Sequence, residues 1–136
     1  MPRIARKNLD CSYLHIIVQG INKEYIFNEE SLKCLYKSIL KKYLLESNIC
    51  ILAYCIMDNH IHILMHSNDI KEISKLMHKT NTSYAKAYNK YKKRVGYVFR
   101  DRFYSQMILS EQQLYNCIVY IHNNPVKANI VSQPSS

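Results

Sequence analysis

The chain has 136 residues, a length that predicts one domain with a single core, and 48% of its residues are hydrophobic, enough to fill that core. No apolar run approaches the roughly 20 residues that a membrane span needs, and no long apolar stretch follows the basic N-terminus as in a secretory signal. The net charge of +9 lies mostly in residues 69–136, which favours nucleic acid or an anionic membrane surface as a partner.

The five cysteines form no Cys-x-x-Cys pair, which argues against a disulfide framework and against a thiolate zinc cluster. Free cysteines fit a reducing cytoplasm, so we expect a cytoplasmic protein. No repeat or low-complexity linker divides the chain. We therefore predict one domain over residues 1–131 and a disordered tail over residues 132–136.

Hydropathy patterns predict seven elements: short apolar or alternating segments typical of strands, and longer segments with the spacing of amphipathic helices. In chain order they are strand 13–19, helix 31–45, strand 49–57, strand 60–66, helix 70–92, strand 103–109 and helix 111–123. Ser110 is predicted to cap the last helix, and Pro125 to end it. The order predicts an α+β fold, a ferredoxin-like split β-α-β sandwich with an antiparallel sheet and an added C-terminal helix.

The strand predicted over 60–66 carries the densest chemical signal. Strand alternation places His60, His62 and His66 on one face, with the intervening apolar residues Ile61, Ile63 and Met65 on the other. His60 and His62 should lie roughly 6–7 Å apart, because each strand residue rises ~3.3 Å, and that spacing suits two ligands of one metal ion. Polar members of a half-exposed face are an equally good interpretation. His66 is more typical of a surface residue, and no partner is identified for His15 or His78.

The last predicted helix places Tyr120 and Asn124 on one face, since they are four residues apart. Tyr120 lies beside the apolar stripe that would dock the helix, which consists of Leu114, Cys117, Ile118 and Ile121. An interfacial tyrosine followed by an Asn-Pro helix stop is the simpler interpretation. If a tyrosine of this helix acts as a nucleophile, Tyr120 is the first candidate and Tyr115, on a different face, is the second.

The histidine and tyrosine segments are chemically complementary. A phenol is a weak nucleophile, but beside a divalent metal that polarises a phosphate it can attack phosphorus and hold a DNA end covalently. Two imidazoles and the amide oxygen of Asn124 would leave about half of the coordination positions of an octahedral ion free for phosphate oxygens. Such mixed ligation is compatible with Mg²⁺ or Mn²⁺, and Mn²⁺ is better suited to imidazole.

The motifs in their order resemble the HUH single-tyrosine transposases of the insertion-sequence 200/605 type, and most of all the REP-associated tyrosine transposases. They are Tyr-Cys-Ile-Met-Asp-Asn followed by His-Ile-His, then Val-Phe-Arg-Asp-Arg-Phe, then Tyr-Ile-His-Asn-Asn-Pro-Val-Lys-Ala. The resemblance runs from about Met1 to Val131. Asp58 is a departure, since many relatives have proline there.

The resemblance implies a ferredoxin-like core, a divalent metal and cleavage of single-stranded DNA near a hairpin through a 5′-phosphotyrosine intermediate. By position it implies that His60 and His62 are metal ligands, Tyr120 the nucleophile and Asn124 the third ligand. It also favours a homodimer, in which either the strand containing His62 pairs across the interface or Tyr120 acts in the partner subunit. A protein with this role would associate with the nucleoid when bound to DNA.

Basic residues gather on the helix predicted over 70–92 and on the segment that follows it, where Phe99 and Phe103 alternate with arginines. Cations interleaved with aromatic rings suit single-stranded nucleic acid, although a solvated lysine face and core phenylalanines are the ordinary alternatives. The candidate DNA contacts are Lys75, Lys79, Lys86, Lys90, Lys93, Arg94, Arg100 and Arg102.

Two other functions compete with a DNA transposase. A zinc-dependent hydrolase would need His60, His62 and His66 as three ligands and would give Tyr120 no role. A non-catalytic hairpin-binding protein derived from a transposase would keep the basic face and bind DNA without a covalent product.

Overall fold

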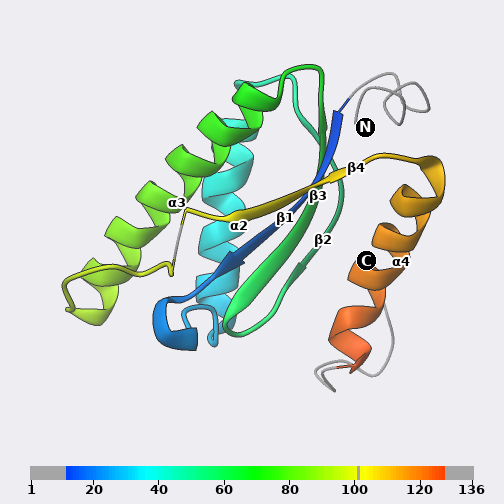
Figure 1. The fold of residues 1–136 in the computed structure, drawn as a ribbon. Coiled ribbons are helices and arrows are strands. Elements are labelled where there is room, and N and C mark those ends of the chain that lie inside the picture. Colours follow the sequence, from blue (N-terminus) through cyan, green and yellow to red (C-terminus); the bar gives the residue numbers. More distant parts are fainter. Residues whose placement is uncertain (1–11, 101, 128–136) are drawn as a thin grey trace.

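The computed structural model describes residues 12–100 and 102–127, and the side chains as far as residue 123. Its elements follow the chain in the order shown in Figure 1. They are β1 (Ser12–Gln19), the short 3-10 helix η1 (Ile21–Lys23), α2 (Glu30–Leu44), β2 (Cys50–Ile56), β3 (His60–Ser67), α3 (Ile70–Lys92), β4 (Tyr104–Ile108) and α4 (Glu111–Lys127). All seven predicted elements are present, whereas η1 was not predicted. The proposed tail over 132–136 lies outside the described residues.

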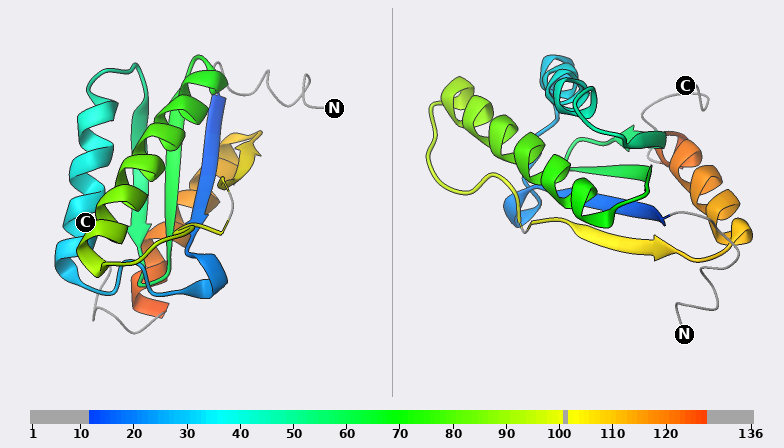
Figure 2. Two further views of the ribbon diagram at one scale, coloured as in Figure 1. Left: turned by 90° about the vertical axis from the view of Figure 1, so that its left-hand side faces the viewer. Right: turned by 90° about the horizontal axis from the view of Figure 1, so that it is seen from above.

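The four strands form one sheet in the order β2-β3-β1-β4, and every neighbouring pair is antiparallel. The prediction that the strand containing His62 pairs across a dimer interface is wrong, because both edges of β3 are paired within the chain. Helices α2 and α3 cover one face of the sheet, and α4 lies on the other (Figures 1 and 2). This arrangement confirms the predicted α+β, ferredoxin-like fold with an added C-terminal helix. None of the helices in the described part of the chain is long and apolar enough to cross a membrane.

Strand alternation divides the apolar residues into two clusters. Ile61, Ile63 and Met65 of β3 belong to the larger cluster, which α2 and α3 cover. Leu64 belongs to a smaller cluster with residues of β2 and α4, including Cys117 and Ile121. Ile121 is fully buried there, so this small cluster holds α4 against the sheet.

The start of α4 is fixed as the sequence predicts. The backbone N–H of Gln113 donates to Oγ of Ser110 over 3.2 Å, and Oε1 of Gln113 accepts from the backbone N–H of Leu109 over 2.7 Å. The first bond satisfies an N–H group that the first turn of a helix leaves without a partner, and the second ties the residue before the cap to that turn. They fix where α4 begins, and therefore the rotation at which its later residues meet the sheet.

The predicted end of α4 is wrong. The helix does not stop before Pro125 but continues to Lys127. Proline removes one helical hydrogen bond, the one from its own missing N–H to the carbonyl of Ile121, and its ring crowds that carbonyl. Because this loss falls in the last turn, the helix can extend two residues further.

Candidate active site

His60 and His62 lie on one face of the sheet, as the alternation predicts, and α4 covers that face. Their ring centroids are 5.0 Å apart and the ring planes are almost perpendicular. This centroid distance is shorter than the predicted 6–7 Å because the rings lean toward each other. His62 is 5% exposed and His60 half-buried. The two imidazoles are therefore close enough to act on one ion or ligand.

His66 lies on the same face but at the other end of β3, where its ring contacts Tyr13 at a centroid distance of 4.6 Å. His66 follows His62 by four positions along the strand, which corresponds to a separation of about 13 Å. Among the described residues, no three histidine, cysteine, aspartate or glutamate side chains are placed to hold a metal ion together. The donor set required for the three-histidine zinc hydrolase is therefore not assembled here.

His15 is a site residue that the sequence analysis missed. Its Nε2 lies 3.0 Å from Nδ1 of His62, and both rings are buried. The strand register explains the contact: Ile17 of β1 is paired with His62, so His15 lies diagonally across from His62 on the same face. Alternation along β1 fixes the face of His15, but only the pairing of β1 with β3 reveals its partner.

Burial keeps these imidazoles neutral. It lowers the pKa of His15 and of His60 below the ordinary value. The pKa of His62 falls to about 4, first because of burial and then because of repulsion from the charged forms of His60 and His15. At neutral pH these rings therefore offer nitrogen lone pairs, the form in which histidine binds metals.

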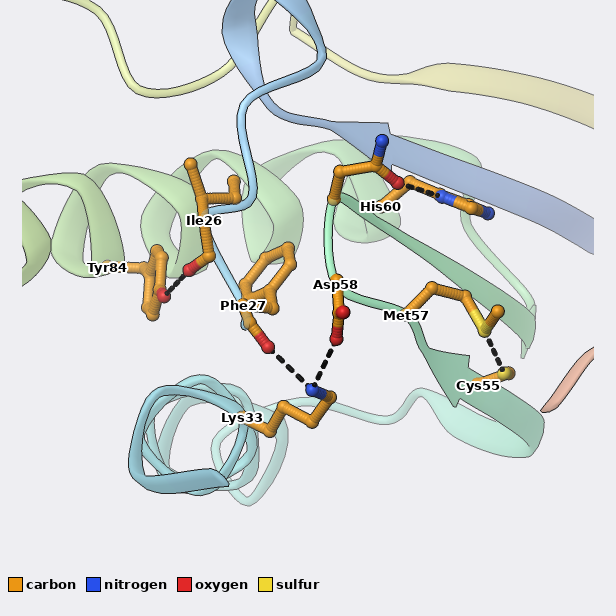
Figure 3. Close-up of polar contacts among 9 residues, drawn as sticks. Ile26, Phe27, Lys33, Cys55, Met57, Asp58, His60 and Tyr84 are labelled. Carbon is orange, nitrogen blue, oxygen red and sulfur yellow. Dashed lines mark hydrogen bonds and ion pairs between the residues drawn. The ribbon is translucent and has the colours of Figure 1, made fainter. Parts of the chain in front are cut away.

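A neighbouring amide orients His60. Nδ1 of His60 lies 2.7 Å from Oδ1 of Asn59. Figure 3 shows His60 beside the β2–β3 turn. An amide oxygen only accepts, so the proton of His60 is on Nδ1 and Nε2 carries the lone pair. His60 therefore presents an imidazole nitrogen lone pair, the kind of donor that histidine offers to a metal.

Tyr120 lies next to these histidines. Its ring centroid is 5.4 Å from that of His62 and 6.3 Å from that of His15, and its side chain is 45% exposed. It lines a cavity of about 400 Å³ between α4 and the sheet, together with His15, Ile17, His62, Gln106, Ile108, Gln113, Asn116 and Cys117. The structure thus brings a solvent-accessible phenol and the buried imidazoles of His15 and His62 into one cavity.

The other two candidates on α4 are placed differently. Tyr115 is 65% exposed and is not among the described residues that line this cavity. The backbone of Asn124 lies one turn beyond Tyr120 in α4, but its side chain lies outside the described residues.

The family pattern described as "Transposase IS200 like" matches residues 8–124. The chain belongs to this family of transposases. The structure is similar to that of a REP-associated tyrosine transposase bound to a REP hairpin, with a TM-score of 0.73, 16% identity, and coverage of 90% of this chain and 71% of that one. It is also similar to a candidate transposase from Deinococcus radiodurans R1, with a TM-score of 0.58, 18% identity, and coverage of 83% and 90%. A sequence search of curated proteins gives no match.

The turn that leads into His60 is anchored in this transposase by Lys33 of α2. Its Nζ donates to the carbonyl of Phe27 over 2.6 Å and to Oδ1 of Asp58 over 3.0 Å (Figure 3). The backbone of Asp58 in turn accepts from the N–H of Phe27 over 2.8 Å. Asp58, the departure from the proline of many relatives, thus holds the β2–β3 turn through its side chain.

The predicted lysine contacts of this transposase do not border the cavity. Lys75, Lys79, Lys86 and Lys90 are exposed on α3, and Lys93 caps that helix. Helix α3 and α4 lie on opposite faces of the sheet (Figure 2). The lysines and Tyr120 therefore form two separate surfaces.

The arginine candidates differ among themselves. Arg94 is half-buried, donates to Oδ1 of Asn89 over 2.7 Å and to the carbonyl of Tyr97 over 3.1 Å, so it holds the loop after α3. Arg100 is exposed and donates to Oε1 of Gln19 over 3.2 Å. Arg102 is exposed as well. The neighbouring Phe99 and Phe103 are partly buried against the main core, which favours the core interpretation over base stacking.

Proposed function

We propose that this transposase cuts and rejoins single-stranded DNA near hairpins, with Tyr120 as the nucleophile. The observation that carries the proposal is the position of the half-exposed Tyr120 side chain in an accessible cavity of about 400 Å³. Its ring centroid lies 5.4 Å from that of His62. A nucleophile beside groups suited to hold a metal is the arrangement that phosphoryl transfer needs. The hairpin bound by the REP-associated relative supports a hairpin substrate.

In the proposed reaction, Oη of Tyr120 loses its proton to solvent and attacks the scissile phosphorus. The bond to the 3′ oxygen of the upstream strand breaks, and that oxygen takes up a proton from solvent. The products are a free 3′-OH and a 5′-phosphotyrosine. A second 3′-OH then attacks that phosphorus and releases Tyr120. One phosphodiester is exchanged for another, so no external energy source is needed.

His60, His62 and Asn124 would hold the divalent ion, Mg²⁺ or Mn²⁺, which when bound polarises the phosphate. Two neutral imidazoles support this assignment, and the mixed donor set suits Mn²⁺ better than Mg²⁺.

The exposed lysines of α3, with Arg100 and Arg102, are proposed to bind the DNA backbone away from the cut. The proposed active form is a homodimer in the cytoplasm, associated with the nucleoid when bound to DNA. The closeness of Tyr120 to His62 of its own chain supports cleavage within one subunit.

The test incubates the protein with labelled single-stranded hairpins from the flanks of its gene and Mn²⁺, followed by a denaturing protein gel. We expect a covalent protein–DNA adduct that is lost with EDTA and in Tyr120→Phe, because that variant keeps the ring and lacks the attacking oxygen. Tyr115→Phe is the matched control from the same helix and should form the adduct normally.

Two results would contradict the proposal. An adduct that survives in Tyr120→Phe but is lost in Tyr115→Phe would move the nucleophile to the other tyrosine. Tight hairpin binding by the wild-type protein without any adduct would favour a non-catalytic hairpin-binding protein.

A further inference from the structure

The contact between His15 and His62 is a hydrogen bond within the plane of the rings. The ring centroids are 5.2 Å apart and the planes differ by 25°, so the 3.0 Å N···N contact joins the facing edges of the two rings. A neutral imidazole has one N–H donor and one lone-pair acceptor. One of the two rings therefore donates, and the direction of this bond decides which nitrogen of His62 carries the proton.

The geometry on β3 indicates the direction. Nδ1 of His62 is taken by His15, so only Nε2 of His62 remains to bind a ligand, and it can bind a metal only without a proton. His60 has the same pattern, since its Nδ1–H donates to Asn59 over 2.7 Å. Metal-binding histidines commonly donate their second ring N–H to a neighbouring acceptor, which fixes the ring and its tautomer.

We propose that His15 is a positioning residue for this site: its Nε2 accepts from Nδ1–H of His62 and so holds His62 in the tautomer whose Nε2 is free to bind the divalent ion. The inference rests on the proposed metal role of His62. His15 is not itself a ligand, because its Nε2 is engaged with His62 and no three-ligand group of histidine, cysteine, aspartate or glutamate exists among the described residues.

The first test needs no metal and no DNA. Long-range ¹H–¹⁵N spectra of ¹⁵N-labelled, metal-free protein at neutral pH report which ring nitrogen of His62 is protonated. We expect the Nδ1–H form in the wild type and in His15→Gln, whose amide oxygen can accept at the place of Nε2. His15→Leu removes the acceptor, so the Nε2–H form should gain population. An Nε2–H tautomer of His62 in the wild type would overturn the inference directly.

The second test measures Mn²⁺ affinity by calorimetry or by electron paramagnetic resonance. Loss of such an orienting partner typically weakens metal binding about 10–100-fold, the loss expected for His15→Leu. His15→Gln should stay within a few-fold of the wild type. His78→Leu, an exposed histidine on α3, is the matched control and should bind Mn²⁺ normally.

Two affinity results would contradict the role of His15. Unchanged Mn²⁺ binding in folded His15→Leu would show that His15 does not position His62. Equal losses of Mn²⁺ affinity in His15→Gln and His15→Leu would show that the imidazole ring itself is needed, rather than an acceptor at its place. If His15→Leu does not fold, the role of His15 is tested by the tautomer of His62 in the wild type and by the Mn²⁺ affinity of His15→Gln. A correct tautomer and His15-dependent Mn²⁺ binding without any DNA adduct would sustain this inference while contradicting the proposed function.

Discussion

The two faces of the sheet are made by the same strands but have different cores. Under α2 and α3 the buried side chains are mostly apolar, and aromatic rings such as Phe27, Tyr36 and Tyr84 pack against one another. The buried polar residues on this face are small or are bonded within the core, as Asn81 is to the hydroxyl of Tyr36. Under α4 a small apolar cluster lies beside buried histidines and an accessible cavity. Buried imidazoles and a cavity cost stability, so the first face must stabilise the fold that the second face needs.

The largest expected effect comes from two neighbouring residues of β3 that point to opposite faces. His62→Ala should reduce adduct formation by more than about 100-fold, because loss of a ligand should exceed the loss of an outer partner. Ile63→Ala should cost about 2–5 kcal/mol of unfolding free energy, because it leaves a cavity in the main core. Urea unfolding and the gel assay separate the two effects. A large loss of stability in His62→Ala would contradict the division between the faces.

The docking of α4 can be weakened without touching a polar group. Ile121 is fully buried, whereas Val119 of the same helix is 38% exposed. Ile121→Ala should destabilise the protein by about 2–5 kcal/mol and lower activity, because Tyr120 would lose its fixed place. Val119→Ala is the control and should change unfolding by less than about 0.5 kcal/mol. Normal adduct formation in Ile121→Ala would show that α4 holds Tyr120 by other contacts.

The smallest expected effect is a pH dependence of the metal-free protein. The pKa of His62 is depressed from 6.5 to about 4 by burial, so below pH 6.5 the unfolded state takes up its proton more readily than the folded state. Stability should therefore be complete above about pH 6.5 and fall by roughly 1–3 kcal/mol as the pH drops to 4. Urea unfolding across this range measures it. His62→Gln should flatten the dependence, and an equally steep curve in that variant would assign it to other groups.

Much of the fold could be predicted because its signals are local. Alternation in residues 60–66 placed the histidines on one face, and Ser110 marked the start of α4. The end of α4 was predicted wrongly, because a proline in the last turn removes one hydrogen bond without forcing the helix to stop. The lysines of α3 were correctly assigned to one helix, but their separation from Tyr120 depends on which face each helix covers.

The sequence by itself determined the elements, the face of each strand residue and the motifs that mark the family, since these depend on neighbours a few residues apart. Only the tertiary structure decided that Tyr120 lies beside His62 and that His15 is bonded to it. These residues are far apart in the chain. Their contacts arise from the β1–β3 register and the docking of α4, which are set by burial of the two cores as a whole.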